Sequence, residues 1–245
     1  MFDHFDRPIT YLRISVTDKC NLRCRYCMPP GGVPPRRHKD FLSFEQVTDV
    51  ARAAVRLGVT KIRLTGGEPL VKRGIVELVR MLAGIPDLPH LAMTTNGTLL
   101  AGSAFPLRDA GLDSVNISLD TLLPDRYRFL TRGGAIHDVL DGIQAARDAA
   151  FPIKINMVVL EDTGQAEIEG MRQFCQEKCL GLQLINHFSL GGKKGERYGF
   201  DRPPSCATCN RIRLMADGML KPCLHSDQEV ALDFSRLEES LQEAV

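Results

Sequence analysis

The chain has 245 residues, of which 44% are hydrophobic and 25% charged, and its formal net charge is +1 at neutral pH. These values are ordinary for a globular protein and exclude the collagen-like, disordered and strongly basic nucleic-acid-binding classes. No apolar run approaches the roughly 18–20 residues needed to cross a bilayer, and the first residues lack the features of a signal peptide. We therefore expect a cytoplasmic protein that binds neither nucleic acid nor membrane.

Short β-branched runs alternate with helical patterns between residues 10 and 190. Strands are predicted at Tyr11–Val16, Lys61–Leu64, His90–Thr94, Ser114–Leu119, Ile153–Leu160 and Gly181–His187. A capping-box pattern at Ser43–Gln46 predicts a helix start, and further apolar stripes with helical spacing begin at Ile75, Ile136 and Ile168. This alternation is typical of α/β proteins with a parallel sheet. Six strands are too few for a closed eight-stranded barrel, which leaves a partial barrel or a doubly wound sheet.

The pattern changes after residue 189. Residues 191–205 are rich in Gly, Pro and charge, as in a linker, so the sequence divides into a barrel region at 1–190, this linker, and a small C-terminal segment at 206–245. Within that segment, Asp217-Gly218 between two short apolar runs predicts a hairpin of Ile212–Met215 with Met219–Lys221. The last dozen residues are predicted to be helical.

The eight cysteines are clustered rather than spread. Disulfide frameworks are typical of small secreted chains, so clustering in a cytoplasmic chain indicates metal binding instead. Cys20, Cys24 and Cys27 directly follow the first predicted strand. Three thiolates leave one iron of a four-iron cluster open, and a zinc site completed by His4 or His38 is the alternative.

The spacing Cys-x3-Cys-x2-Cys, with an aromatic residue before the last cysteine, resembles the signature of the radical S-adenosylmethionine (SAM) enzymes. The resemblance implies a partial (βα)6 barrel and a [4Fe–4S] cluster whose open iron binds SAM and cleaves it to a 5′-deoxyadenosyl radical. Thr65-Gly66-Gly67-Glu68-Pro69 is similar to the segment that binds the SAM amino group in that family, although alone it reads as a turn. The resemblance assigns SAM binding to Tyr26, Gly66, Gly67, Glu68 and Ser118.

A second trio, Cys206, Cys209 and Cys223, encloses the predicted hairpin. On spacing alone, a zinc site completed by His225 and an iron–sulfur cluster are equally compatible. The run Cys209-Asn-Arg211-Ile-Arg213 resembles the C-terminal motif of the radical SAM GTP cyclases of molybdenum cofactor biosynthesis. That resemblance implies a second [4Fe–4S] cluster that binds the guanine of GTP. It assigns substrate binding to Arg13, Arg63, Thr94, Lys154, Arg211 and Arg213.

Three departures from the cyclase pattern bear on the substrate. Gln183 stands where the cyclases carry an arginine for the triphosphate, and Phe188 stands where they carry a methionine against SAM. The segment 189–205 is short, and the final residues 241–245 differ from the Gly-Gly tail of the cyclases. We therefore keep two-cluster radical chemistry on another nucleotide, a small metabolite or a peptide as the alternative to GTP. A non-catalytic zinc module is a third hypothesis, but it leaves the Gly-Gly-Glu-Pro segment unexplained.

Cys175 and Cys179 lie four residues apart on the last predicted helical stripe. They fit a redox or metal pair, but free cysteine is commonly buried as a small hydrophobe, so we expect both to pack in the core. The resemblance also implies an external reductase as electron donor and allows a homodimer.

Overall fold

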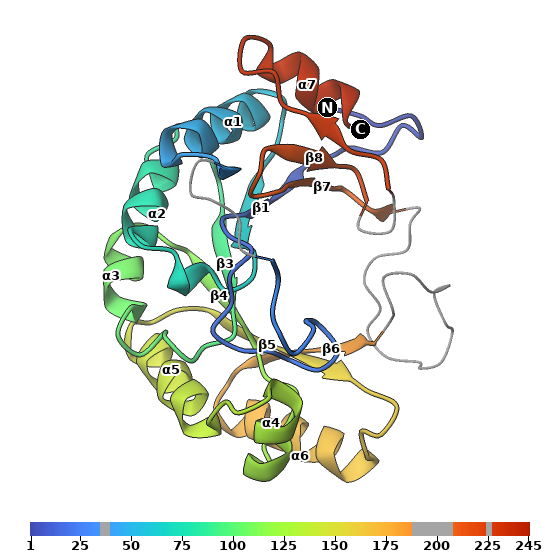
Figure 1. Cartoon of the computed structure of the whole chain (residues 1–245). Helices are drawn as coiled ribbons and strands as arrows, with labels where there is room; N and C mark the ends of the chain where they lie inside the picture. The colour runs from blue at the N-terminus through green and yellow to red at the C-terminus, as the bar shows by residue number, and fades with distance from the viewer. Residues whose placement is uncertain (35–39, 188–207, 224–226) are drawn as a thin grey trace.

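A computed structural model describes residues 1–34, 40–187, 208–223 and 227–245. Its strands form a nine-stranded sheet in the order β6-β5-β4-β3-β2-β1-β7-β8-β9, which curves into an open barrel (Figure 1). The first six strands are parallel: β1 (Tyr11–Ser15), β2 (Lys61–Thr65), β3 (Leu91–Thr95), β4 (Ser114–Ser118), β5 (Ile153–Val159) and β6 (Gly181–Asn186). All six predicted strands are confirmed to within one residue at each end, and so is the partial barrel.

Helices connect the parallel strands and cover the outer side of the sheet (Figure 1). The predicted helices are α1 (Phe44–Arg56), α2 (Ile75–Ala83), α5 (Ile136–Asp148) and α6 (Gln165–Glu177). At the start of α1, Ser43 and Gln46 form the expected reciprocal capping box. The sequence analysis missed the short elements η2 (Pro69–Val71), α3 (Ala104–Asp109) and α4 (Pro124–Thr131). Helices this short carry little periodic signal.

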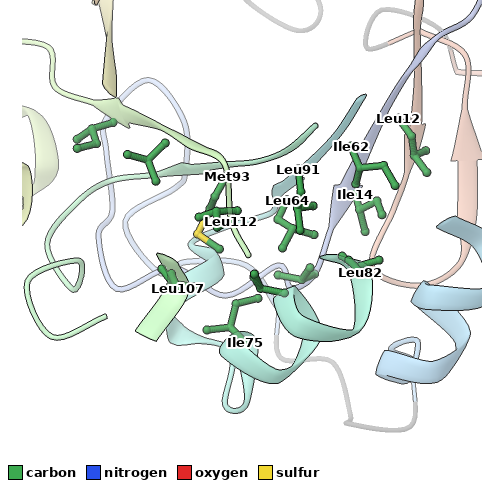
Figure 2. Close-up of a cluster of buried hydrophobic side chains, with 14 of the residues drawn as sticks. Leu12, Ile14, Ile62, Leu64, Ile75, Leu82, Leu91, Met93, Leu107 and Leu112 are labelled. Atoms are coloured by element: carbon green, nitrogen blue, oxygen red, sulfur yellow. The ribbon is translucent and has the colours of Figure 1, made fainter. Parts of the chain in front are cut away.

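The hydrophobic core lies between the sheet and these helices (Figure 2). In β1, Leu12 and Ile14 are fully buried toward the helices, whereas the alternate residues face the interior of the barrel. Ile62 and Leu64 of β2 are buried in the same core. Because side chains alternate along a strand, an apolar outer face leaves the inner face available for polar residues.

The C-terminal segment extends the same sheet. β7 (Arg211–Leu214) pairs in parallel with β1, followed by the antiparallel strands β8 (Met219–Lys221) and β9 (Val230–Ala231) and by α7 (Leu237–Glu243). The predicted hairpin and the terminal helix are confirmed. The parallel pairing with β1 was not predicted, and it places Arg211 and Arg213 beside Tyr11 and Arg13.

The expectation that both Cys175 and Cys179 pack in the core is half correct. Cys175 is buried, but α6 ends at Glu177 and Cys179 is exposed beyond it. The N–H of Cys179 donates to Gln176 and the N–H of Leu180 donates to Cys175, which is a Schellman ending with Cys179 in the left-handed conformation (φ 54°). This ending turns Cys179 away from the apolar stripe.

In the described part of the chain, no helix combines the length and apolar character needed to span a membrane.

Candidate active site

The loop after β1 carries the first cysteine trio. The N–H groups of Cys27 and Met28 both donate to the carbonyl of Cys24 (3.0 Å each), which folds the last two cysteines into one tight turn. Burial raises the pKa of the Cys24 thiol to about 12, and the neighbouring Asp120, Cys27 and Cys20 add to this rise. The structure therefore brings all three predicted thiols within electrostatic reach of one another.

Backbone hydrogen bonds fasten this loop to the end of α4. The N–H of Arg23 donates to the carbonyl of Thr131 (3.2 Å) and the N–H of Arg25 to that of Leu130 (2.9 Å). The Arg132 guanidinium then donates to the carbonyls of Arg23 and Met28, at 2.7 Å each. The cysteine loop is thus positioned by the fold.

The thiol trio fits a four-iron cluster better than a single ion. Within the described ranges, no three His, Cys, Asp or Glu side chains converge as ligands of one metal ion. A four-iron cluster binds each cysteine through a different iron, so it does not require such convergence. Of the two histidines considered as a fourth zinc ligand, His4 lies in the wall of the cavity described below, which none of these cysteines lines, and His38 lies outside the described residues.

The Gly66-Gly67 pair lies directly against the start of the cysteine loop. The N–H of Gly67 donates to the carbonyl of Thr17 (2.7 Å) and the N–H of Glu68 to that of Lys19 (2.8 Å). A Cβ atom on Gly67 would lie 2.1 Å from the Lys19 carbonyl oxygen, and Gly66 has φ 146°. Only glycine allows this approach, so the predicted SAM segment and the cysteine loop form one rigid unit.

Glu68 connects this unit to the end of β3. Its carboxylate is buried and accepts hydrogen bonds from Thr95 Oγ1 (2.7 Å), the N–H of Asn96 (2.6 Å) and the N–H of Leu70 (3.0 Å). Burial is the main cause that raises the pKa of this carboxyl group. Since both oxygens already accept bonds from the protein, Glu68 positions the segment, and its direct contact with SAM stays a prediction.

Tyr26 lies beneath the ends of β4, β5 and β6. Its hydroxyl donates to Asp120 Oδ2 (2.6 Å), and Asp120 Oδ1 accepts from the N–H of Val158 (2.8 Å). The Tyr26 ring also meets His187 edge-on, with centroids 6.0 Å apart. Ser118, the other predicted SAM residue nearby, ends β4. The sequence analysis assigned no role to His187, and no local pattern marks it.

A second group of predicted residues lines one cavity of about 680 Å³ inside the open barrel. All six predicted substrate residues line it: Arg13, Arg63, Thr94, Lys154, Arg211 and Arg213. Cys209 and Cys223 also line it, whereas Cys206 and His225 lie outside the described residues. The structure therefore places the predicted residues in two groups. One group is the cysteine loop with the SAM segment, and the other lines this cavity.

Neighbouring strands arrange the cavity cations in two rows. Arg213, Arg13 and Arg63 are paired positions of β7, β1 and β2, and Arg211, Tyr11 and Lys61 form the next row two residues earlier. The rows are about 7 Å apart because a strand rises about 3.3 Å per residue. Tyr11 and Lys61 escaped the sequence analysis. Counting back two positions from Arg13 and Arg63 would have found them.

The cation rows have no anionic partners in the part of the chain that the structure describes. Among the residues that the structure describes, none of the five cations in these rows forms an ion pair with a carboxylate. Burial is the main cause that lowers the pKa of Arg13 to about 10. Tyr11 has the largest opposing effect, and the neighbouring Arg213, Arg63 and Arg211 each lower the pKa as well. Arg211 Nε and Arg213 Nη1 are buried and have no hydrogen-bond partner among the described residues. Buried, unpaired guanidinium groups are costly, so this wall is built for an anionic ligand.

Cys209 and Cys223 lie beside this wall. Burial lowers the pKa of Arg213, and these two thiols act in the opposite direction, which places both near its guanidinium group. The donor set fits a metal centre next to the anion site. The choice between zinc and a four-iron cluster depends on residues outside the described ranges.

A profile of the Radical SAM superfamily matches residues 14–175, which include the first cysteine trio, the Gly-Gly-Glu segment, the end of β1 and the strands β2 to β5. The chain belongs to the radical SAM superfamily. Membership implies a [4Fe–4S] cluster and SAM. That Cys20, Cys24 and Cys27 bind this cluster stays a prediction. The second trio lies beyond the matched range.

Sequence relatives and solved structures agree with this assignment. The chain is 42% identical to the GTP 3′,8-cyclase of Moorella thermoacetica, covering 94% of this chain and 85% of the relative. It is 40% identical to the GTP 3′,8-cyclase of Alkaliphilus oremlandii, with the same coverage. The fold matches Streptococcus suis SuiB bound to S-adenosylmethionine (TM-score 0.74, 15% identity), covering 97% of this chain but only 63% of SuiB. It also matches anSMEcpe with bound AdoMet (TM-score 0.72, 16% identity), covering 97% of this chain and 80% of that one.

The departures noted in the sequence have different outcomes. Gln183 lines the cavity beside the predicted substrate residues. Glu243, Ala244 and Val245 line it as well, although the sequence analysis gave them no role. Phe188 and the segment 189–205 lie outside the described residues.

Proposed function

We propose that this radical SAM enzyme is a GTP 3′,8-cyclase with two [4Fe–4S] clusters, which catalyses the first step of molybdenum cofactor biosynthesis. The observation that carries the proposal is one cavity that combines the thiols of Cys209 and Cys223 with two rows of cations that form no ion pair within the described residues. A purine nucleoside triphosphate carries several negative charges on its phosphates, which these cations can bind. Its purine base has nitrogen and oxygen atoms that could reach an open iron. The names of the sequence relatives support the same substrate.

In this proposal the residues have separate tasks. Cys20, Cys24 and Cys27 hold the cluster that binds SAM, and Tyr26, Gly66, Gly67, Glu68 and Ser118 form the SAM site. When bound, the cluster and SAM would supply a radical able to take a hydrogen atom from the ribose, which would let the sugar carbon attack the guanine ring. Cys206, Cys209 and Cys223 would hold the second cluster, whose open iron would bind the base.

The remaining residues bind and orient the substrate. Arg13, Arg63, Lys154, Arg211 and Arg213 bind the triphosphate and the base, because arginine forks match phosphate and ring acceptors. Thr94, near the end of β3, lines the same cavity and accepts a hydrogen bond from Arg63 (3.2 Å). An external reductase in the cytoplasm supplies the electron.

Gln183 supports the alternative of a different substrate. A neutral amide in the cavity wall, where the cyclases carry an arginine, removes one charge that would bind a phosphate. Another nucleotide with fewer phosphates would tolerate this exchange better than GTP.

One experiment separates the two functions. The protein is reconstituted anaerobically with iron and sulfide, then incubated with SAM and dithionite alone, with GTP, with GMP or with ATP. We expect 5′-deoxyadenosine to increase with GTP, together with a product that has the mass of GTP. An increase with GMP or ATP but not with GTP would identify the alternative. Cys24→Ala serves as the inactive control.

A further inference from the structure

The end of α4 presents an aromatic side chain to solvent. Phe129, in the last turn of this helix, is 52% exposed. The guanidinium group of Arg25, which is also exposed, lies over its ring at 3.8 Å from the ring centroid, and Arg25 Nε donates to the Phe129 carbonyl (3.0 Å). Arginine and aromatic residues are enriched where proteins contact one another, so this exposed pair indicates a docking surface.

Positive charge collects around this pair. Arg128, the residue before Phe129, is exposed as well. Arg23 and Arg132 are half-buried where the cysteine loop meets the end of α4. We call Arg23, Arg25, Arg128, Phe129 and Arg132 the α4 patch. In the described part of the chain, none of its four arginines forms an ion pair with a carboxylate, so their charge is not neutralised locally.

Two carboxylates lie near the α4 patch. Asp125 is in the first turn of α4, at the end of the helix remote from the cysteine loop. Asp138 lines a hollow of about 310 Å³ together with Arg23 and Arg132. Four arginines against these two carboxylates leave a positive surface, which is complementary to a partner with negative charge.

The α4 patch is joined to the cysteine loop. The N–H groups of Arg23 and Arg25 donate to the last carbonyls of α4, and the Arg132 guanidinium donates to carbonyls at both ends of the stretch 23–28. This stretch contains the last two cysteines of the first trio. A molecule docked on the α4 patch would therefore touch Arg25, the residue that directly follows Cys24.

We propose that the α4 patch docks a small acidic electron-carrier protein, which reduces the cluster held by Cys20, Cys24 and Cys27. Electron transfer between proteins slows steeply with distance, so a donor must dock next to its acceptor. Redox partners use small contacts that bury less than about 1,200 Å², and complementary charge speeds their association. The carrier loses one electron, the oxidised cluster gains it, and no proton moves. The inference rests on the first cluster of the proposed function and not on GTP as substrate.

The test compares two reductants of the reconstituted protein, flavodoxin hydroquinone as the acidic carrier and dithionite as a small reductant that needs no docking surface. Reduction of the first cluster is followed by rapid freezing and electron paramagnetic resonance, and this cluster is identified as the part of the spectrum that changes with SAM. We expect Arg25→Gln/Arg128→Gln to slow reduction by flavodoxin about tenfold at low ionic strength, with a smaller difference in added salt. Reduction by dithionite should change little.

Two further variants separate charge from apolar contact. Arg52→Gln/Arg80→Gln also removes two exposed charges, but from α1 and α2, which lie away from α4 (Figure 1), so both rates should stay unchanged. Phe129→Ser keeps the charge of the patch. It should weaken flavodoxin binding to the loaded protein several-fold and leave the salt dependence of that binding the same.

The outcomes distinguish the inference from the proposed function. Equal rates with flavodoxin in the parent and in Arg25→Gln/Arg128→Gln would overturn the inference and leave the proposed function intact. An equal loss of rate with both reductants would also overturn it, since it would show damage to the cysteine loop. A dimeric parent that becomes monomeric in this variant, as measured by sedimentation, would assign the patch to a second copy of the chain instead. A parent protein without any SAM-sensitive four-iron signal would overturn both.

Discussion

Arg13 of β1 and Arg213 of β7 occupy paired positions in adjacent parallel strands, and both line the same cavity. Arg213 lowers the pKa of Arg13, since both carry positive charge in a wall without carboxylate partners among the described residues. Such a pair is unfavourable in the empty protein and becomes favourable when an anion binds between the two side chains. The stability of this wall is therefore coupled to its ligand.

Replacing Arg13 by Gln should separate these two effects. Repulsion within the wall falls, so the ligand-free protein should melt at a higher temperature. Affinity for GTP should fall roughly tenfold or more, because a hydrogen bond to a charged group contributes about 1.5–3 kcal/mol. Thermal melting with and without GTP or tripolyphosphate measures both. A variant that loses stability and keeps its ligand-induced shift would contradict an anion site at Arg13.

Gln183→Arg should strengthen triphosphate binding. The side chain lines the cavity, and a guanidinium group there adds a cation to the existing set. We expect the dissociation constant for GTP to fall by up to roughly tenfold and that for guanosine to remain the same. Isothermal titration with the two ligands provides the comparison. Equal changes for both would show that position 183 does not face the phosphates.

Gly67→Ala should disrupt the contact between the SAM segment and the cysteine loop. The new methyl group would overlap the Lys19 carbonyl, so the backbone must separate at a cost of about 1–3 kcal/mol. We expect lower stability and loss of SAM binding. Gly102→Ala is the matched control, because a Cβ there has no neighbour within 4 Å. If Gly67→Ala bound SAM as well as Gly102→Ala did, the two segments would not form a rigid unit.

Cys24→Ala should remove the first cluster. Chemical iron analysis after reconstitution should show a loss of about four irons per chain, together with loss of SAM cleavage. Cys179→Ala is the control, since Cys179 is exposed at the end of α6 and distant in sequence from both trios. Deoxyadenosine formation that persists in Cys24→Ala would refute the assignment of this ligand.

Local patterns sufficed to predict the barrel strands, whereas the residues on their inner faces were assigned through the resemblance to the cyclases. Arg13, Arg63 and Lys154 lie where their alternation with buried residues places them. The predicted bounds of the strands were also correct to within one residue, because the β-branched runs end where the loops begin. These features depend on near neighbours in the chain, which a sequence shows directly.

Contacts between distant segments could not be predicted in this way. The pairing of β7 with β1 joins residues about 200 positions apart, and no local sequence feature of either strand indicates with which strand it pairs. Cys179 illustrates a different limit. Its spacing from Cys175 fits the helical stripe, but the helix ends before it in a left-handed turn that usually requires glycine.

The account depends most on GTP being the molecule whose ribose loses a hydrogen atom. The direct measurement is the mass of the 5′-deoxyadenosine formed from GTP that carries deuterium at the 3′ carbon of its ribose. The account predicts transfer of one deuterium to deoxyadenosine, together with a product that has lost this label. Unlabelled deoxyadenosine, formed at the same rate with and without GTP, would contradict it.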